Sequence, residues 1–470
     1  MKSIASVLSI IALGFGLLGC PGSGGGGGGS TPAFAVSTTT ADFGVVGNAY
    51  TSTLVSTGGT APFTWTLFGG VLPNGLSLNA GTGVVSGTPD TAGNSTVDFT
   101  VTDSTGQTAN GSVLFAVHPR TDLLSVNNSV PPLPGIGASS APSISDNGRF
   151  VAFASSANNL IPGVSGSQIY IHDWQTNQTS LVSRDSGVAI NHGSGISSAP
   201  SISSDGRFVA FVSAATNLVP GVSGLQIYLR DVQTGVTSLV SKDNSGNPAT
   251  GGSIMASPRI SGNGRFIAYV SDASNLITGV VSQQIYLYDT QTSVMFPNGQ
   301  TTLISQATSG VVGNGGSSNP TISSNGRFVA FTSASSNLTG DADPAPTQIF
   351  LRDTQSSTTT LISQATGGAV GDGASSQPAI SDDGGFVAFT SLASNLAPIP
   401  GGSGAQIFLR NTQANTTSLV SQTAVGGIAG NGASSQPTIS DDGGFVAFSS
   451  VSTNLGAAGG GNQIYIRALP

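Results

Sequence analysis

Charged side chains and cysteine are what this sequence lacks most. Asp, Glu, Lys and Arg make up 7% of its 470 residues, whereas soluble proteins contain about 25%. The 13 Lys and Arg residues form no cluster and the net charge is −8, which excludes nucleic-acid binding and electrostatic docking on anionic lipid. Cys20 is the single cysteine, so an intrachain disulfide framework and a cysteine-based zinc site are excluded.

Histidine is scarce as well, which limits the possible catalytic chemistry. The three histidines, His118, His172 and His192, lie in different segments. A nucleophilic triad needs a base that a third group orients, and a zinc site needs three or four ligands. Neither can be assembled here, and the sequence has no G-x-S-x-G elbow or phosphate loop. We therefore expect no catalytic residues, no metal and no cofactor.

Gly, Ser, Thr and Asn are abundant instead, with 67 glycines. Runs rich in Val, Ile, Phe and Tyr alternate with turn residues, and no helical period occurs. This pattern favours an all-β repeat protein over a disordered low-complexity chain.

The N-terminal segment predicts export to the cell envelope. Lys2 precedes an apolar run from Ile4 to Leu18, shorter than the about 20 residues of a membrane span. The run ends in LLGC at Cys20, which resembles the bacterial lipobox. The resemblance implies that residues 1–19 are a lipoprotein signal peptide and that Cys20 is lipidated. Pro21, where Asp would favour retention in the inner membrane, implies the outer membrane or cell surface.

Residues 20–33 follow as a Gly-rich flexible tether. Residues 34–118 then alternate strand-like runs with turns, as in a β-sandwich. Trp65 with Phe63 and Leu67 occupy alternate positions, so we expect all three on one side of a strand.

Several motifs of this region recur together in one known family. LPNGLSL (72–78), TGVVSGTP (82–89) and FTVTD (99–103) follow in order. They resemble the immunoglobulin-like modules, related to cadherin folds, of bacterial surface proteins, which implies a spacer or adhesive arm. Asp103 stands where related modules bind calcium, but one carboxylate is far from the six to eight oxygens that calcium takes. We interpret Asp103 as a turn residue.

Residues 120–470 contain six copies of one repeat. Each copy offers four short strands, which in the second copy are residues 199–203, 207–213, 226–231 and 237–241. Four antiparallel strands per repeat predict a six-bladed β-propeller, and a β-solenoid fits less well because its repeats are shorter. All six copies share one phrase, in which a turn is followed by Gly, Arg or Gly, Phe, Val or Ile, Ala, and Phe or Tyr. The first Phe of this phrase is Phe150, Phe208, Phe266, Phe328, Phe386 and Phe445.

The ends of the repeat array predict closure of the ring. The sixth copy ends with residues 463–470 and lacks a fourth strand, while Thr121–Val126, before the first copy, matches the fourth-strand pattern. We expect this N-terminal strand to complete the last blade, because closure removes exposed sheet edges.

The pattern PxIS-(D/N)G-RFVAF-QIYLRD, over roughly residues 120–470, resembles TolB-like bacterial propeller repeats. The resemblance implies a binding platform, with calcium as a possible ligand by family analogy. Many relatives carry an Asp before the third strand, where this chain has Gln, which argues against the calcium role. The glutamines are Gln168, Gln226, Gln284, Gln348, Gln406 and Gln463.

Features repeated in every blade are interpreted as scaffold. The Asn-Leu pair and the glycine of the first turn recur in all six copies, and Asp146, Asp382 and Asp383 are assigned to turn chemistry. His172 is expected on the surface. The arginine before the phrase's first Phe is lost in two copies, so we expect solvated or inter-blade hydrogen bonding there rather than a cationic ring.

Long connections between the second and third strands, and between blades, are expected as flexible loops on one face of the propeller. Ligands usually bind such loops. The candidate ligand-binding residues on this long-loop face are Arg184, Asp185, His192, Lys242, Asp243, Asp341, Asp343 and Asp372.

Three functions remain open from the sequence. The first is a non-catalytic, lipid-anchored envelope protein that recognises a protein or glycan through the long-loop face. The second is a self-associating adhesin or coat component, which abundant Ser, Thr and Asn favour. The third is a polysaccharide lyase or glycosidase with carboxylates meeting in the propeller channel. Ligand identity and oligomeric state do not follow from the sequence.

Overall fold

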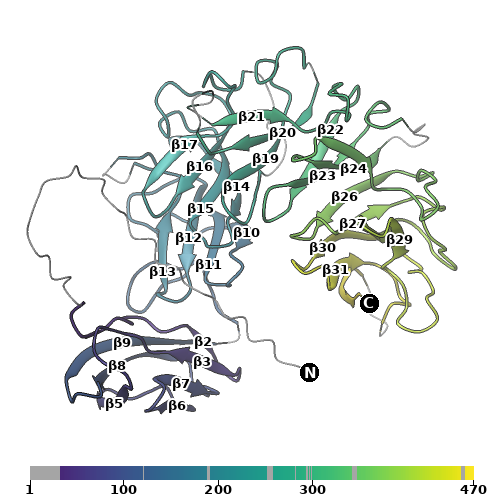
Figure 1. The fold of residues 1–470 in the computed structure, drawn as a ribbon. Helices are drawn as coiled ribbons and strands as arrows, with labels where there is room; N and C mark the ends of the chain where they lie inside the picture. Colours follow the sequence, from purple (N-terminus) through teal and green to yellow (C-terminus); the bar gives the residue numbers. More distant parts are fainter. Residues whose placement is uncertain are drawn as a thin grey trace, which may run out of the picture. The chain divides into compact units, whose positions relative to one another are not determined.

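The computed structural model describes residues 32–119, 121–187, 191–250, 258–280, 282–292, 295, 297, 299–340, 347–456 and 461–469. All regular elements in these ranges are β-strands, and none of their residues forms a membrane-spanning helix. The chain divides into two compact units, Met1–Thr121 and Asp122–Pro470 (Figure 1). The expected all-β class, an Ig-like sandwich followed by six propeller blades, is confirmed. Cys20, Asp341 and Asp343 lie outside the described residues.

The first unit is a β-sandwich whose two main sheets enclose one apolar core. Trp65 and Phe99 are buried in this core, as their alternation predicts. Leu67 stands opposite the buried Phe99 in the ladder, as Trp65 stands opposite Val101, so Leu67 and Trp65 lie on the same side of the strand, as expected. Leu67 is nevertheless 40% exposed. It lies next to an irregularity in the register between Leu67 and Gly69, near the end of an edge strand. The larger sheet has the strand order β2 (Gly44–Val45), β9 (Thr108–His118), β8 (Gly93–Thr102) and β5 (Thr64–Gly69). The second sheet has the order β3 (Tyr50–Thr53), β7 (Val84–Gly87) and β6 (Leu76–Asn79). A small third sheet pairs β1 (Ala35–Val36) with β4 (Ser56–Thr57).

The second unit consists of six antiparallel sheets in chain order. Blade 1 contains β10 (Ser139–Ile144), β11 (Phe150–Ser155), β12 (Gln168–Asp173) and β13 (Gln178–Leu181). Blade 2 contains β14 (Ser197–Ile202), β15 (Phe208–Ser213), β16 (Gln226–Asp231) and β17 (Val236–Leu239). Blade 3 contains β18 (Arg259–Ile260), β19 (Phe266–Ser271), β20 (Gln284–Asp289) and β21 (Gln300–Leu303). Blade 4 contains β22 (Ser317–Ile322), β23 (Phe328–Ser333), β24 (Gln348–Asp353) and β25 (Thr358–Leu361). Blade 5 contains β26 (Ser375–Ile380), β27 (Phe386–Ser391), β28 (Gln406–Asn411) and β29 (Thr416–Leu419), and blade 6 contains β30 (Ser434–Ile439), β31 (Phe445–Ser450) and β32 (Gln463–Ala468).

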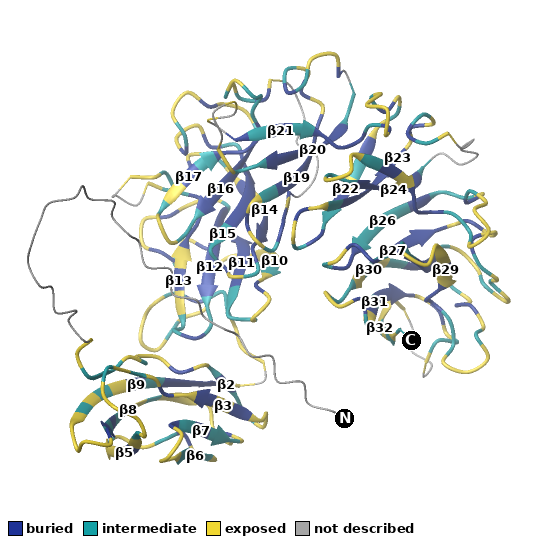
Figure 2. Ribbon diagram, in the orientation of Figure 1, coloured by how far each residue is buried: buried dark blue, intermediate teal, exposed yellow. Residues whose placement is uncertain are grey.

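Each blade packs on the next through its buried middle strands and its first turn (Figure 2). The turn glycine of one blade rests on the phrase's first Phe of the preceding blade. Gly206 has φ of +76°, and a Cβ there would lie 2.2 Å from Cδ2 of Phe150. The repeated glycine therefore provides both a left-handed turn and a close contact between blades.

The expected closing strand does not form in this structure. The sheet of blade 6 has three strands, and Thr121–Val126 makes no ladder with β32. The end of this segment is held by blade 1 instead, since Thr179 Oγ1 donates to the Val126 carbonyl at 2.6 Å. The facing apolar side chains of the two end blades consequently remain exposed, with Ile144 at 62%, Ile464 at 77% and Ile466 at 72%.

Candidate functional site

The long-loop face is built by the connections between the second and third strands of each blade and by those between blades. An asparagine of the repeated Asn-Leu pair joins the two kinds of loop. Asn217 Oδ1 accepts from Ser194 N at 2.7 Å, and its Nδ2 donates to the His192 carbonyl at 2.9 Å. The same pair of bonds is made by Asn159, Asn275, Asn337, Asn395 and Asn454.

The glutamine that begins the third strand of each blade is a second anchor. Buried Gln226 donates through Nε2 to the Ala249 carbonyl at 2.9 Å, and its Oε1 accepts from Ser241 Oγ at 2.6 Å. A neutral amide both donates and accepts, which a carboxylate cannot do. The described loops are therefore held by a repeated network of hydrogen bonds.

The acidic candidates on this face are engaged within their own loops. Asp185 accepts from Gly187 N and Asn191 Nδ2, and Asp243 from Ser245 N and Asn247. Burial opposes ionisation of Asp243, but these bonds outweigh it and lower its pKa. These carboxylates cap the turns of their own loops, which is a simpler role than binding a ligand.

Asp372 is held in the same way but stands beside a pocket. Its two oxygens accept from the amide and the hydroxyl of Ser394, at 2.6 and 2.5 Å. The Ser394 hydroxyl is the main cause that lowers the pKa of Asp372. The carboxylate therefore fixes the loop that forms one wall of the pocket.

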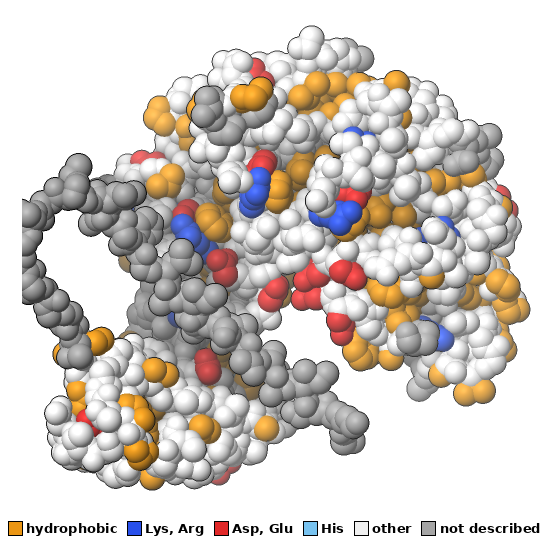
Figure 3. All heavy atoms as spheres, viewed as in Figure 1, with side chains coloured by type: hydrophobic (Ala, Val, Ile, Leu, Met, Phe, Trp, Pro, Cys, Tyr) orange, Lys and Arg blue, Asp and Glu red, His pale blue; other side chains and the backbone are white. Residues whose placement is uncertain are grey.

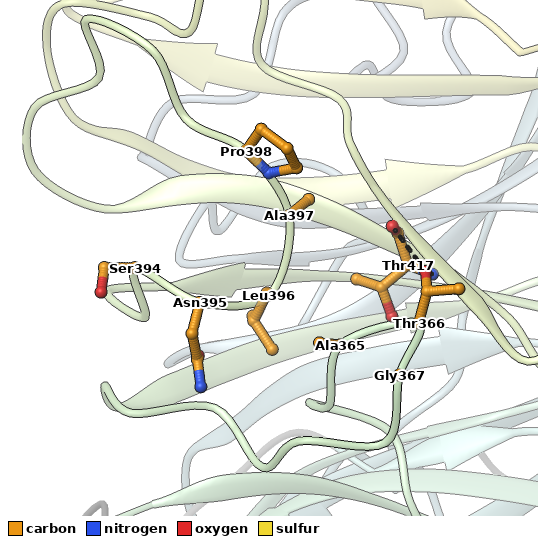
Figure 4. A pocket seen from close by; sticks show the side chains of 9 residues that line it. All are labelled: Ala365, Thr366, Gly367, Ser394, Asn395, Leu396, Ala397, Pro398 and Thr417. Atoms are coloured by element: carbon orange, nitrogen blue, oxygen red, sulfur yellow. Dashed lines mark hydrogen bonds between the residues drawn. The ribbon is translucent and has the colours of Figure 1, made fainter.

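That pocket has a volume of about 390 Å³ and lies between blades 4 and 5. Figure 4 shows the loop Ser394–Pro398 along one side and Thr366 with Thr417 along the other. Thr366 Oγ1 accepts from Thr417 N at 3.0 Å. The lining contains hydroxyl, amide and small apolar groups and no charged side chain, so it suits a neutral polar ligand.

The basic candidates lie apart from this pocket. Lys242 Nζ lies 5.2 Å from the centroid of the Tyr288 ring, and burial lowers the Lys242 pKa. His192 Nδ1 is 3.0 Å from the Gly193 carbonyl. Arg184 lines a cavity between blades 1 and 2. The described candidates are thus distributed over several loops and do not converge on one site.

The third-strand position of His172 is buried, which corrects its assignment to the surface. His172 is 1% exposed, and its Nδ1 lies 2.9 Å from Thr179 Oγ1. Arg230 at the same position of blade 2 donates to the Asp185 carbonyl at 2.8 Å. The loop leading into each blade covers this position, so it joins blades instead of facing solvent.

The repeated arginines form ion pairs within their own blades. Arg207 donates through Nε and Nη2 to the two oxygens of Asp231, at 3.1 and 2.7 Å, and its guanidinium lies over the Phe208 ring. Arg149, Arg265 and Arg327 pair likewise with Asp173, Asp289 and Asp353. In blades 5 and 6 the arginine becomes Gly385 and Gly444, and the Asp becomes Asn411 and Ala468. Both partners are lost together. Of the two expected roles, inter-blade hydrogen bonding is not seen for these pairs, and the arginine side chains are partly exposed, at 33–44%.

The first-turn aspartates fall into two groups. Asp383 Oδ1 accepts from Ser381 Oγ and Gly385 N, as turn chemistry predicts. Asp382, one residue earlier, instead lies in the field of Asp441 and Asp146. Burial and then these charges raise the pKa of Asp382 to about 6, and burial with Asp146 raises that of Asp441.

The repeat pattern did not predict this convergence of carboxylates, although the position varies between blades as Asp, Ser, Gly, Ser, Asp and Asp. Figure 3 shows acidic side chains gathered between the blades. No group of three or more His, Cys, Asp or Glu side chains able to hold a metal occurs in the part of the chain that the structure describes.

Asp103 is a turn anchor in the first unit. Its Oδ1 accepts from the Thr105 amide and hydroxyl and from Gln107 N, and its Oδ2 from Thr60 N. The Thr105 hydroxyl is the largest cause that lowers the Asp103 pKa. Both oxygens are thus used in holding the turn, as the sequence interpretation states.

Residues 29–118 match the family described as "Putative Ig domain". No curated protein matches the sequence. Among solved structures, the chain is similar to "putative TolB from Agrobacterium tumefaciens" at 17% identity, with a TM-score of 0.36 over 72% of this chain and 92% of that chain. It is also similar to the β-propeller domain of the Trilobed protease from Pyrococcus furiosus, at 9% identity and a TM-score of 0.41 over 93% and 94%.

Proposed function

We propose that this chain is a non-catalytic binding protein of the bacterial envelope. It is anchored by a lipid at Cys20, on the outer membrane or cell surface, and recognises a protein or glycan through the long-loop face of its propeller. The observation that carries the binding role is the pocket between Ser394–Pro398 and Thr366 with Thr417. Hydroxyl and amide groups on a loop that hydrogen bonds already hold in place bind sugar or peptide groups with little loss of conformational freedom.

The anchor is supported by Lys2, the short apolar run and the lipobox-like end at Cys20. Cell fractionation tests it. We expect Cys20→Ala to move the exported protein from the membrane fraction to the soluble fraction. Unchanged membrane association of this variant would contradict lipidation.

The binding role is tested by filling the pocket. Ala397 lines it, and Ala397→Arg places a long side chain inside. Thr339→Arg is the matched control, because Thr339 follows the Asn-Leu pair of blade 4 as Ala397 follows that of blade 5. We expect the chain and the Thr339→Arg variant to bind an envelope polysaccharide or protein saturably in surface plasmon resonance, and Ala397→Arg to lose this binding. Equal binding by all three folded proteins would remove the site from this pocket.

Self-association is a second candidate function, which the open edge of β32 favours. Its exposed Ile464 and Ile466 lie beside unpaired backbone groups, and such an edge is a template for a strand of another copy. We expect sedimentation velocity to show association that rises with concentration. Lysine at both isoleucine positions abolishes it, whereas Val425→Lys, on a loop residue that is 88% exposed, does not. A chain that stays monomeric throughout would contradict this function.

A further inference from the structure

A cavity of about 670 Å³ lies between β12 and β13 of blade 1 and the first turn and third strand of blade 2. It is separate from the long-loop pocket, because Thr176 and Gln233 of the short third-to-fourth-strand turns, and Gln178 at the start of β13, contribute to its wall. Ile171, Leu181 and Val232 supply an apolar side. This volume is within the range of small-molecule sites.

Two guanidinium groups, those of Arg184 and Arg230, face this cavity, and no carboxylate of the described residues forms a salt bridge with either. Arg230 is 4% exposed, and its Nη1 donates to the neutral Asp185 carbonyl and Thr237 Oγ1, both at 2.8 Å. Arg184 Nη2 donates to the Gly187 carbonyl at 3.1 Å. Arg184 Nε is buried and has no hydrogen-bond partner among the described residues.

The other charges nearby are already committed. Asp173 and Arg207, which also line the cavity, pair with Arg149 and Asp231. Asp205 accepts from Ser203 Oγ and from the Arg207 amide, and the Asp185 carboxylate accepts from its own loop. Burial, and next the charge of Arg184, lowers the pKa of Arg230 to about 10. The two cations therefore repel each other in a partly desolvated place, which an anion would relieve.

The scaffold does not require this pair of cations, because the corresponding positions of the other blade junctions lack it. In three junctions the first member is a glutamine whose Nε2 donates to a carbonyl three residues earlier, at 2.8 Å. In another, Lys242 lies over the Tyr288 ring. The corresponding pairs are Val126 with His172, Lys242 with Tyr288, Gln306 with Arg352, Gln364 with Arg410 and Gln422 with Arg467.

We propose that the cavity between blades 1 and 2 binds a sugar acid, whose carboxylate lies on Arg184 and Arg230. Guanidinium groups recognise carboxylates through paired N–H donors. The amides of Gln178 and Gln233 and the Thr176 hydroxyl offer partners for sugar hydroxyls, and Ile171, Leu181 and Val232 pack on the apolar face of the ring. The inference does not rest on the proposed long-loop site, and either can fail without the other.

Isothermal titration calorimetry with galacturonate, glucuronate, galactose and inorganic phosphate tests this site. The informative variant is Arg184→Gln, because glutamine occurs naturally at this position in blades 3, 4 and 5. Lys242→Gln, the same change one blade later, is the control. We expect a uronate to bind the unaltered chain, Arg184→Gln to weaken it by at least about 10-fold, and Lys242→Gln to leave it unchanged. Galactose should not bind.

Two further measurements separate the sugar-acid site from a purely structural role. Without ligand, Arg184→Gln should raise the melting temperature, because it removes the repulsion with Arg230. With ligand, binding should weaken as salt is added. Absence of uronate binding, or an affinity that Arg184→Gln does not change, would overturn the site. Phosphate bound as tightly as the uronates would overturn the assignment to a sugar acid.

Discussion

Blades 1 and 2 begin with the same hexapeptide, Ser-Ser-Ala-Pro-Ser-Ile, but bury it to different extents. In β14 its last residue, Ile202, is 8% exposed, whereas in β10 the equivalent Ile144 is 62% exposed. In both blades the hexapeptide strand pairs with the second strand in the same register, including the irregularity after the second serine. The difference is the neighbour, because blade 2 packs on blade 1 and no blade covers β10 from the other side.

The same contrast recurs in the first turns. Gly206 rests on Phe150, while Gly148 of blade 1 has no atom within 4 Å of where its Cβ would be. At the other end of the array, Phe445 of blade 6 is 47% exposed. Identical motifs thus contribute little or much to stability according to whether the adjacent repeat is present, as in other nearest-neighbour repeat arrays.

The largest expected effect comes from truncating the buried isoleucine. Ile202→Ala removes side-chain atoms from the core between blades 1 and 2, and it should cost about 2–5 kcal/mol of unfolding free energy. Ile144→Ala, in the same hexapeptide, should cost less than about 0.5 kcal/mol. Denaturant unfolding of the two variants measures the difference. Equal losses would mean that β10 is covered in solution.

The turn glycines give a second matched pair. Gly206→Ala and Gly148→Ala both force alanine into a left-handed turn, with φ of +76° and +70°, which costs roughly 1–2 kcal/mol. Gly206→Ala also places a Cβ against the Phe150 ring, adding about 1–3 kcal/mol. A lower melting temperature for Gly206→Ala than for Gly148→Ala is expected. Identical melting temperatures would show that Gly148 meets a ring of its own.

The converging carboxylates of blades 1, 5 and 6 predict a pH dependence. Because folding raises the Asp382 pKa from 3.8 to about 6, its stabilising contribution is complete below about pH 4 and is lost as the pH rises through 6. Asp382→Asn should therefore raise the melting temperature at pH 7.5 and flatten its dependence on pH. The control is Asp383→Asn, since asparagine occupies that turn position in blades 1, 3 and 4. If Asp382→Asn and Asp383→Asn both show the same dependence of melting temperature on pH as the unaltered chain, the three carboxylates do not interact.

The ion pairs should show the smallest effect and no contrast between blades. Arg149 and Arg207 each pair with an Asp of their own blade and are partly exposed. Arg149→Ala and Arg207→Ala should lower the melting temperature equally and by little, since exposed pairs contribute weakly. Asp173→Ala should cost more than Arg149→Ala, because Asp173 Oδ1 also accepts from Gln175 N. A larger fall in melting temperature for Arg207→Ala than for Arg149→Ala would show that the ion pair also stabilises the contact between blades.

The candidate site was only partly accessible to sequence reasoning. The long-loop face and the structural role of the Asn-Leu pair followed from repetition, because a residue kept in every blade marks a contact that every blade makes. The pocket at Ser394–Pro398 did not follow, since its neutral side chains resemble those of any loop. The convergence of Asp146, Asp382 and Asp441 joins the first blade to the last two, so no local pattern records it.

By itself, the sequence determined the all-β class, the Ig-like module, the six repeats with four strands in each of the first five, and the turns with their glycines. These features depend on side-chain alternation and backbone conformation, which act within a few residues. Tertiary structure decided that the third-strand position of His172 is buried, that Arg184 and Arg230 meet across a cavity, and that Thr121–Val126 does not pair with β32. Each of these depends on which surfaces of distant repeats come into contact, and the periodicity of the sequence does not show which surfaces meet.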